Sequence, residues 1–174
     1  MLILVLGGAR SGKSQVAEDF ALRLPQPVTY MATLTHDGTD ADLEARIDAH
    51  RRRRPGTWHT IDANSDIAEQ LLAIEGTVLL DSLGPWVAGH GSDAEATDSL
   101  VAAVAKRRGD TVVVSDEVGM SVHPTTEAGL VFRDALGAVN TAVAQVADRT
   151  FLIVAGRVVT TAAANFDTML AGGR

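Results

Sequence analysis

The chain has 174 residues, of which 46% are hydrophobic and 21% charged, so one globular domain is expected rather than a disordered chain. Its formal net charge of −7 argues against nucleic-acid binding as a main function. The absence of cysteine excludes disulfides and thiolate catalysis, and no apolar run approaches the roughly 18 residues of a membrane span. Without a signal-peptide pattern at its start, the chain is expected to be a cytoplasmic enzyme with its domain in residues 1–160 and a tail in 161–174.

The amino-terminal segment predicts a buried strand followed by a phosphate-binding loop. Residues 2–6 (LILVL) are unbroken apolar residues, and residues 7–14 (GGARSGKS) match the P-loop pattern G-x-x-x-x-G-K-[ST]. In this motif glycines let backbone N–H groups surround a polyphosphate, while Lys13 reaches the terminal phosphates and Ser14 offers its hydroxyl to Mg²⁺. The helix predicted over 14–24 directs its positive end at the same phosphates. We therefore expect bound nucleoside triphosphate, with Lys13 catalytic and these residues in contact with it: Gly7, Gly8, Ala9, Arg10, Ser11, Gly12, Lys13 and Ser14.

The next segment carries a histidine beside a block of arginines. A second strand is predicted over 28–32, followed by Thr33 at the sheet edge where open α/β folds bind ligands. A helix is predicted over 41–53, in which His50 shares the apolar stripe of Leu43 and Ile47. From spacing alone, His50 is either a hydrogen-bonded core histidine or a nucleophile, and the four arginines that follow it are either a solvated face or phosphate ligands. Residues 58–62 predict a short extended piece.

The middle of the chain predicts a metal ligand and a loop. A helix capped by Asn64 or Ser65 is expected to run to about residue 74, before a buried strand over 77–80. Asp81 ends that strand, and an acid in this position is the usual partner of a P-loop, holding Mg²⁺ directly or through water. Ser14 and Asp81 are thus the predicted metal ligands. Residues 82–92, which include Trp86, are rich in glycine and proline and predict a mobile or substrate-facing loop.

The remaining segments complete an alternation of strands and helices. Helices are predicted over 93–108 and 126–148, the second with Val146 on its inner stripe. Strands are predicted over 111–115, 151–154 and 158–160. The alternation predicts an α/β fold with a mostly parallel, doubly wound sheet and helices on both faces. The nucleotide site is expected at the carboxyl ends of the strands, where the P-loop, Thr33, Asp81 and Glu117 would converge.

Several stretches together resemble one enzyme family. They are GGARSGKS at 7–14, MAT at 31–33, RIDAHRRRRPGTWHTID at 46–62, LLDSLGPWV at 79–87, SDEVGMSVHP at 115–124 and FRDALGAVN at 132–140. They are similar to the bifunctional adenosylcobinamide kinases / adenosylcobinamide-phosphate guanylyltransferases of cobalamin biosynthesis. The resemblance implies a RecA-like P-loop fold, Mg²⁺ dependence, a homotrimer, and GTP or ATP with adenosylcobinamide and its phosphate as substrates. It also implies that GMP passes from GTP through a histidine to the phosphorylated acceptor.

The resemblance assigns residue roles that the patterns alone leave open. It makes His50 the carrier of GMP, which suits a neutral imidazole near physiological pH. Four adjacent arginines on a helix cannot all face one ligand, so we expect one or two of them to contact phosphate. Glu117 either orients water, metal or the acceptor hydroxyl, or it caps the strand end. The further nucleotide contacts implied by the resemblance are Ala32, Thr33, Leu34, Arg51, Arg52, Arg53, Arg54, Asp62 and Asp81.

Two other functions are compatible with the motifs. One is a P-loop small-molecule kinase without nucleotidyl transfer, which would never carry label on histidine. The other is a RecA-like nucleotide-dependent switch, which would bind nucleotide without turnover of cobinamide. A P-loop contacts phosphates alone, so the choice between GTP and ATP stays open.

Overall fold

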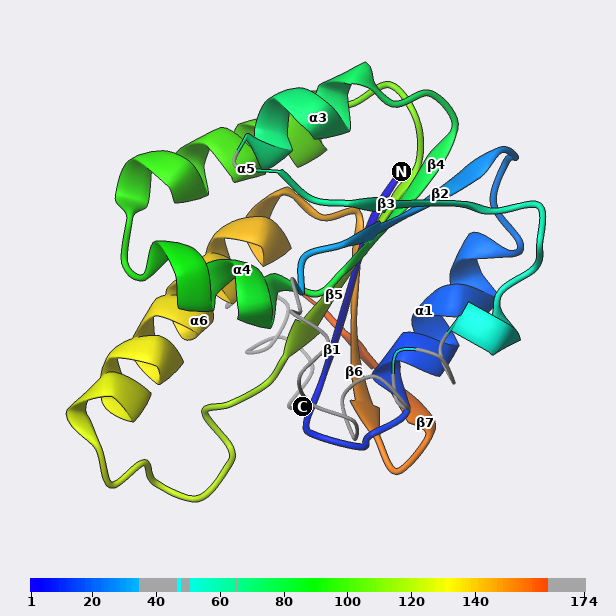
Figure 1. Cartoon of the computed structure of the whole chain (residues 1–174). Coiled ribbons are helices and arrows are strands. Elements are labelled where there is room, and N and C mark those ends of the chain that lie inside the picture. Colours follow the sequence, from blue (N-terminus) through cyan, green and yellow to red (C-terminus); the bar gives the residue numbers. More distant parts are fainter. Residues whose placement is uncertain (35–46, 48–50, 65, 163–174) are drawn as a thin grey trace, which may run out of the picture.

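The computed structural model describes residues 1–34, 47, 51–64 and 66–162, which form a seven-stranded sheet with helices on both faces (Figure 1). The sheet order is β3-β2-β4-β5-β1-β6-β7. All neighbouring strands are parallel except β7, which is antiparallel to β6. The strands are β1 (Leu2–Gly7), β2 (Val28–Ala32), β3 (His59–Asp62), β4 (Thr77–Asp81), β5 (Thr111–Asp116), β6 (Arg149–Val154) and β7 (Arg157–Thr161).

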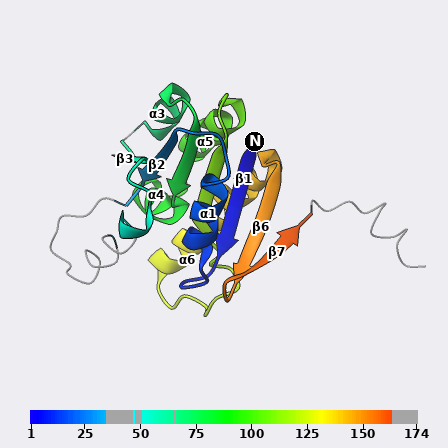
Figure 2. The ribbon, with the colours of Figure 1, turned by 90° about the vertical axis from the view of Figure 1, so that its right-hand side faces the viewer.

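The helices divide between the two faces of the sheet (Figures 1 and 2). Helix α1 (Lys13–Ala21) packs on one face, against β1, β4 and β5. The other face is covered by α3 (Ile67–Ala73), α4 (Leu83–His90), α5 (Ala94–Lys106) and α6 (Glu127–Val146). Successive residues of β1 supply the two cores: Leu2 and Leu4 face the larger helical layer, whereas Ile3 and Val5 face α1. This alternation explains why the strand is apolar throughout.

Strand β5 lies between β1, which leads into the P-loop, and β4, which ends in Asp81. The order confirms the predicted P-loop, RecA-like class, a mostly parallel sheet with helices on both faces. It also brings the carboxyl end of β5 directly beside the P-loop, because Gly7 is in register with Asp116.

The loop predicted over 82–92 is wrong, because residues 83–90 form helix α4. Leu83, Trp86 and Val87 have helical spacing and are buried in the larger core. Pro85 lies in the first turn, where a missing N–H costs the helix little. Trp86 is 6% exposed, so it is a core residue of this helix.

Three predicted helix details also differ in the structure. Helix α3 is capped by Asp66, whose carboxylate accepts a hydrogen bond from the Glu69 amide, and not by Asn64 or Ser65. Helix α1 ends at Ala21, before the prolines expected to stop it. Val146, expected on the inner stripe of α6, is 38% exposed. The helix predicted over 41–53 lies largely outside the described residues; within them, Ile47 and residues 51–53 are helical. Most of the tail predicted over 161–174 also lies outside them, and its first residue, Thr161, is the end of β7.

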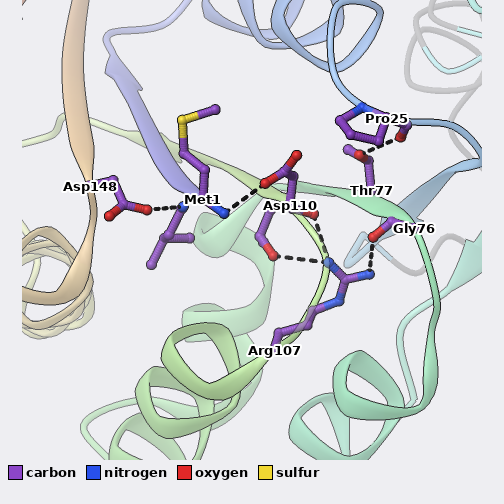
Figure 3. Close-up of polar contacts among 9 residues, drawn as sticks. Met1, Pro25, Gly76, Thr77, Arg107, Asp110 and Asp148 are labelled. Carbon is purple, nitrogen blue, oxygen red and sulfur yellow. Dashed lines mark hydrogen bonds and ion pairs between the residues drawn. The ribbon is translucent and has the colours of Figure 1, made fainter.

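Polar contacts join the amino-terminal ends of the strands, opposite the P-loop (Figure 3). The amino terminus pairs with Asp110 at 2.6 Å, and the Leu2 amide donates to Asp148 at 2.6 Å. The buried Arg107 side chain follows α5 and donates to backbone carbonyls near the starts of β4 and β5, including that of Gly76 at 2.7 Å. These contacts fix the strand starts.

Candidate functional site

The P-loop has the backbone geometry that a phosphate cradle requires. A Cβ on Gly7 would lie 2.9 Å from the Ile153 carbonyl oxygen, so a side chain does not fit there. Gly12 has φ 92°, in the left-handed region that glycine favours, and α1 starts at the next residue. The loop is closed by the Ser11 amide, which donates to the Gly8 carbonyl at 3.2 Å.

Neighbouring strand ends hold this loop from two sides. On one side, the amide of Gly156, in the turn between β6 and β7, donates to the Ser11 carbonyl at 2.8 Å. On the other, the Glu117 amide donates to the Gly7 carbonyl at 3.1 Å. The cradle is therefore anchored to strands that follow it by more than a hundred residues.

Lys13 is held by an acid that the sequence patterns did not single out. Its ammonium nitrogen Nζ lies 2.7 Å from Asp116 Oδ1 and 3.3 Å from the Gly8 carbonyl oxygen. The lysine side chain is 13% exposed. Asp116 ends β5, and its pairing with Lys13 depends on β5 lying next to β1.

A cavity of about 410 Å³ lies at the carboxyl ends of the central strands, where the sequence placed the site. It combines P-loop residues with residues from the arginine block and from the ends of β2, β3, β4 and β5. Its lining residues are Ala9, Arg10, Lys13, Ser14, Tyr30, Ala32, Leu34, Ile47, Arg51, Arg54, Thr60, Asp62, Asp81, Ser82, Pro85 and Asp116.

Asp81 is oriented by a buried tyrosine. The Tyr30 hydroxyl donates to Asp81 Oδ2 at 2.8 Å. Burial of the phenol, followed by the charge and hydrogen bond of Asp81, raises the pKa of Tyr30 above its ordinary value. The Arg54 guanidinium stacks on the Tyr30 ring, with its central carbon 3.4 Å from the ring centroid. Arg54 Nη1 also donates a hydrogen bond to Thr60 Oγ1 at 3.3 Å. Sequence reasoning missed Tyr30; the signal was an aromatic hydroxyl within the buried strand VTYMA.

The arginines of the block have different surroundings. Arg51 and Arg54 line the cavity. Arg53 instead pairs with the buried Glu18 of α1, at 3.3 and 3.4 Å. Arg52 is exposed and does not line this cavity. Two of the four arginines therefore line the cavity, and contact of one or two of them with phosphate stays a prediction.

Of the other predicted nucleotide contacts, some line the cavity and some do not. Ala32, Leu34 and Asp62 line the cavity. The Thr33 hydroxyl instead donates to the Ser82 carbonyl and accepts from the Ser82 amide at 3.1 Å, joining the ends of β2 and β4. Within the P-loop, the lining residues are Ala9, Arg10, Lys13 and Ser14. His50 lies outside the described residues.

Glu117 does not converge on the cavity with the P-loop, contrary to expectation. Its carboxylate accepts hydrogen bonds from the amides of Gly119 at 3.0 Å and Met120 at 2.9 Å. It lines a separate hollow of about 360 Å³ beside α6. These contacts match the capping alternative, and the acid in the cavity is its neighbour Asp116.

The donor set in the cavity suits Mg²⁺. Ser14 and Asp81 contribute hydroxyl and carboxylate oxygens, the hard donors that Mg²⁺ prefers. Among the described residues, no cluster of three or more His, Cys, Asp or Glu side chains is arranged for a metal ion. Mg²⁺ in phosphate-binding sites typically takes one or two carboxylates and completes its shell with water and phosphate. The residues present therefore fit a metal bound together with nucleotide.

Comparison with known proteins identifies relatives across almost the whole chain. A family model described as cobinamide kinase / cobinamide phosphate guanyltransferase matches residues 3–161. A bifunctional adenosylcobalamin biosynthesis protein CobU from Salmonella typhimurium is 34% identical, with 90% of this chain and 97% of the relative aligned. A bifunctional adenosylcobalamin biosynthesis protein CobP from Pseudomonas aeruginosa is also 34% identical, with 88% and 92% aligned.

A solved structure supports the fold independently. The protein PH0250 from Pyrococcus horikoshii matches with a TM-score of 0.54 at 8% identity, covering 95% of this chain and 88% of its own. In the part of the chain that the structure describes, no helix is long and apolar enough to cross a membrane. The match of the family model, together with relatives aligned over nearly their full length, establishes that this chain belongs to the cobinamide kinase / cobinamide phosphate guanyltransferase family.

Proposed function

We propose that this enzyme phosphorylates adenosylcobinamide on its aminopropanol hydroxyl and then transfers GMP from GTP, through a guanylyl-histidine at His50, to the resulting phosphate. The products are adenosyl-GDP-cobinamide and pyrophosphate. One observation carries the proposal: a single cavity is lined by the P-loop residues Lys13 and Ser14 and by Arg51 and Arg54, from the block that follows His50. Phosphate-binding and nucleotidyl-transfer residues thus border the same space.

In the kinase step, the P-loop and the amino-terminal end of α1 hold the triphosphate. Lys13 would leave Asp116 in part to contact the terminal phosphates, which carry the greatest negative charge. Ser14 and Asp81 would hold Mg²⁺, which supplies neutralisation of phosphate charge when bound. Tyr30 keeps the Asp81 carboxylate oriented toward the cavity by its hydrogen bond.

In the guanylyl-transfer step, the His50 imidazole attacks the α-phosphorus of GTP. A nitrogen–phosphorus bond forms, the bond from the α-phosphorus to the bridging oxygen breaks, and pyrophosphate leaves. The acceptor phosphate then displaces the imidazole. Arg51 and Arg54 would neutralise charge on the α-phosphate and the leaving pyrophosphate. The positions of Ile47 and Arg51, which flank residues 48–50 and both line the cavity, support this role for His50.

Incubation with α-labelled GTP tests the covalent step. The wild-type protein should retain label that is labile in acid and stable in alkali, as a histidine phosphoramidate is, and His50→Ala should retain none. His59→Ala is a matched control, because His59 is exposed on the edge strand β3 and does not line the cavity. Absence of label on the wild type, or equal labelling of His50→Ala, would contradict the proposal.

Product analysis with adenosylcobinamide and GTP separates the proposal from a P-loop kinase that lacks nucleotidyl transfer. His50→Ala should still form adenosylcobinamide phosphate but no adenosyl-GDP-cobinamide. A wild-type protein that stops at the phosphate would favour the simple kinase. The homotrimer implied by the family resemblance belongs to the same proposal and is tested by sedimentation equilibrium.

A further inference from the structure

Asp116 and Glu117, adjacent acids at the carboxyl end of β5, have opposite surroundings. The Glu117 carboxylate is occupied by the amides of its own loop, Gly119 and Met120. The Asp116 carboxylate lines the nucleotide cavity and contacts Lys13. Of these two acids, Asp116 is therefore the one that lines the cavity with the P-loop.

The position of Asp116 relative to the P-loop follows from the strand register. Asp116 is in register with Gly7, the first residue of the cradle. Its Oδ1 atom lies 2.7 Å from Lys13 Nζ, the group that contacts terminal phosphates in P-loops. With nucleotide bound, Lys13 would contact the terminal phosphate, and the Asp116 carboxylate would lie next to Lys13.

Neighbouring elements contact both the backbone and the carboxylate of Asp116. The Asp116 backbone carbonyl accepts a hydrogen bond from Asn140 Nδ2 at 3.0 Å, which joins β5 to α6. At the start of α4, a Cβ on Gly84 would lie 3.1 Å from Asp116 Oδ2, so this helix contacts the carboxylate closely. The Asp116 carboxylate is thus contacted by Lys13 of α1 and by the start of α4, while β1 and α6 hold its backbone, as expected for a preorganised catalytic group.

Electrostatics then limits what this carboxylate does. A carboxylate next to a triphosphate experiences repulsion unless a proton donor or a cation lies between them. Once the Lys13 ammonium also contacts the phosphates, it compensates the negative charge of the Asp116 carboxylate only in part. The Asp81 carboxylate already accepts from Tyr30 and is the proposed metal ligand. The hydroxyl of an acceptor substrate that enters the cavity is a donor that Asp116 can meet there.

We propose that Asp116 is the catalytic residue that binds and deprotonates the acceptor hydroxyl in the phosphoryl-transfer step. The inference rests on the kinase half of the proposed function. A bond forms between the acceptor oxygen and the γ-phosphorus, and the bond from the γ-phosphorus to the bridging oxygen breaks. The nucleoside diphosphate leaves, and the hydroxyl proton passes to the Asp116 carboxylate and from there to solvent.

The test compares Asp116→Asn with the wild type in both half-reactions. Asparagine keeps the shape of the side chain and removes its ability to take a proton. With cobinamide and GTP, kcat for phosphorylation should fall by about 10²- to 10⁴-fold, while KM for GTP stays within about threefold. GMP transfer from GTP to preformed cobinamide phosphate should stay within about threefold, because that acceptor carries no proton to remove. Asp98→Asn, the same change on the exposed side of α5, should leave both rates unchanged.

Three results would overturn the assignment. One is phosphorylation by Asp116→Asn within about threefold of the wild-type rate. The second is an equal loss of phosphorylation and GMP transfer, because a general structural role would affect both. The third is loss of phosphorylation in Glu117→Gln but not in Asp116→Asn. A wild-type protein that never phosphorylates cobinamide would instead overturn the proposed function, and this inference with it.

Discussion

The Tyr30 side chain combines a core position with a role in the cavity. It is the chain's one tyrosine, it is 6% exposed, and its hydroxyl donates to Asp81 at 2.8 Å. Burial, and then the Asp81 charge, raise the pKa of this phenol above the ordinary value of about 10. The folded chain therefore holds the phenol proton more tightly than the unfolded chain does.

The sign of the resulting pH dependence follows from linkage. The contribution of Tyr30 to the free energy of unfolding is complete below pH 10 or so and is lost as the pH rises further, by up to about 1.4 kcal/mol per pH unit. We expect Tyr30→Phe to lack this alkaline loss, which denaturant unfolding of both proteins at several pH values will measure. Near-ultraviolet absorbance reads the single phenol directly. A phenolate that forms in the folded protein at its ordinary pKa would contradict the prediction.

At the scale of elements, Arg107 joins α5 to the carboxyl end of α3 and to the starts of two strands; Figure 3 shows its contact with Gly76. Its guanidinium donates to the carbonyls of Leu71 at 3.1 Å, Ile74 at 2.9 Å and Gly76 at 2.7 Å. Arg107→Met would leave these carbonyls without a donor in a buried region. We expect the free energy of unfolding to fall by about 3–5 kcal/mol.

Denaturant unfolding measures that loss, and the neighbouring residue supplies the control. Arg108 is exposed, so Arg108→Met should change stability by less than about 0.5 kcal/mol. Activity per folded molecule should be retained in both variants, because Arg107 lies at the amino-terminal ends of the strands, whereas the cavity lies at their carboxyl ends. An Arg107→Met protein as stable as Arg108→Met would show that water satisfies these carbonyls.

The turn between β6 and β7 offers a stabilising substitution. Ala155 has φ 50° and Gly156 has φ 73°, which is the pattern of a two-residue turn that favours glycine at both positions. Left-handed backbone costs alanine about 1–2 kcal/mol, whereas glycine's extra chain entropy costs less. Ala155→Gly should therefore stabilise the protein by about 0.5–1 kcal/mol in thermal or denaturant unfolding.

The same substitution in a helix should have the opposite sign. Ala138 is exposed within α6, where glycine costs about 1 kcal/mol relative to alanine. Destabilisation by both Ala155→Gly and Ala138→Gly would mean that flexibility in the turn outweighs its strain. That result would also indicate that the turn supports the P-loop, since the Gly156 amide donates to Ser11.

At the scale of the whole molecule, the central strands were easier to predict from the sequence than helix α4 and its buried Trp86. The strands of the sheet centre were predictable because each is an apolar run that ends in Gly or Asp. Helix α4 was not, since Gly84 and Pro85 in its first turn imitate a loop. The burial of Trp86 could not be predicted either, because it depends on contacts with α6 and the sheet and not on local sequence.

The site shows the same division between local motifs and long-range contacts. Lys13, Ser14 and Asp81 were predictable because the P-loop and its acidic partner specify both the residue type and its place at a strand end. The pairing of Lys13 with Asp116 was not, because it depends on β5 lying between β1 and β4. Strand order arises from the packing of the complete chain and leaves no local signal.

The proposed use of one cavity for both reactions makes a kinetic prediction. The described cavity, about 410 Å³, combines the P-loop with Arg51 and Arg54 and is of the size of one small-molecule site. The nucleotide that donates a phosphoryl group and the GTP that donates GMP should therefore compete for it. We expect GDP to inhibit cobinamide phosphorylation and His50 labelling by α-labelled GTP with the same inhibition constant.

A P-loop variant tests whether the two reactions use the same nucleotide site. Lys13→Met removes a cation that contacts the terminal phosphates, so it should weaken GDP inhibition of both residual reactions by the same factor. Inhibition constants that differ by more than about tenfold, a free-energy gap of about 1.4 kcal/mol, would require two separate nucleotide sites. Equal constants would mean that the triphosphate must be exchanged between the two reactions, because the spent GDP occupies the position that the next GTP needs.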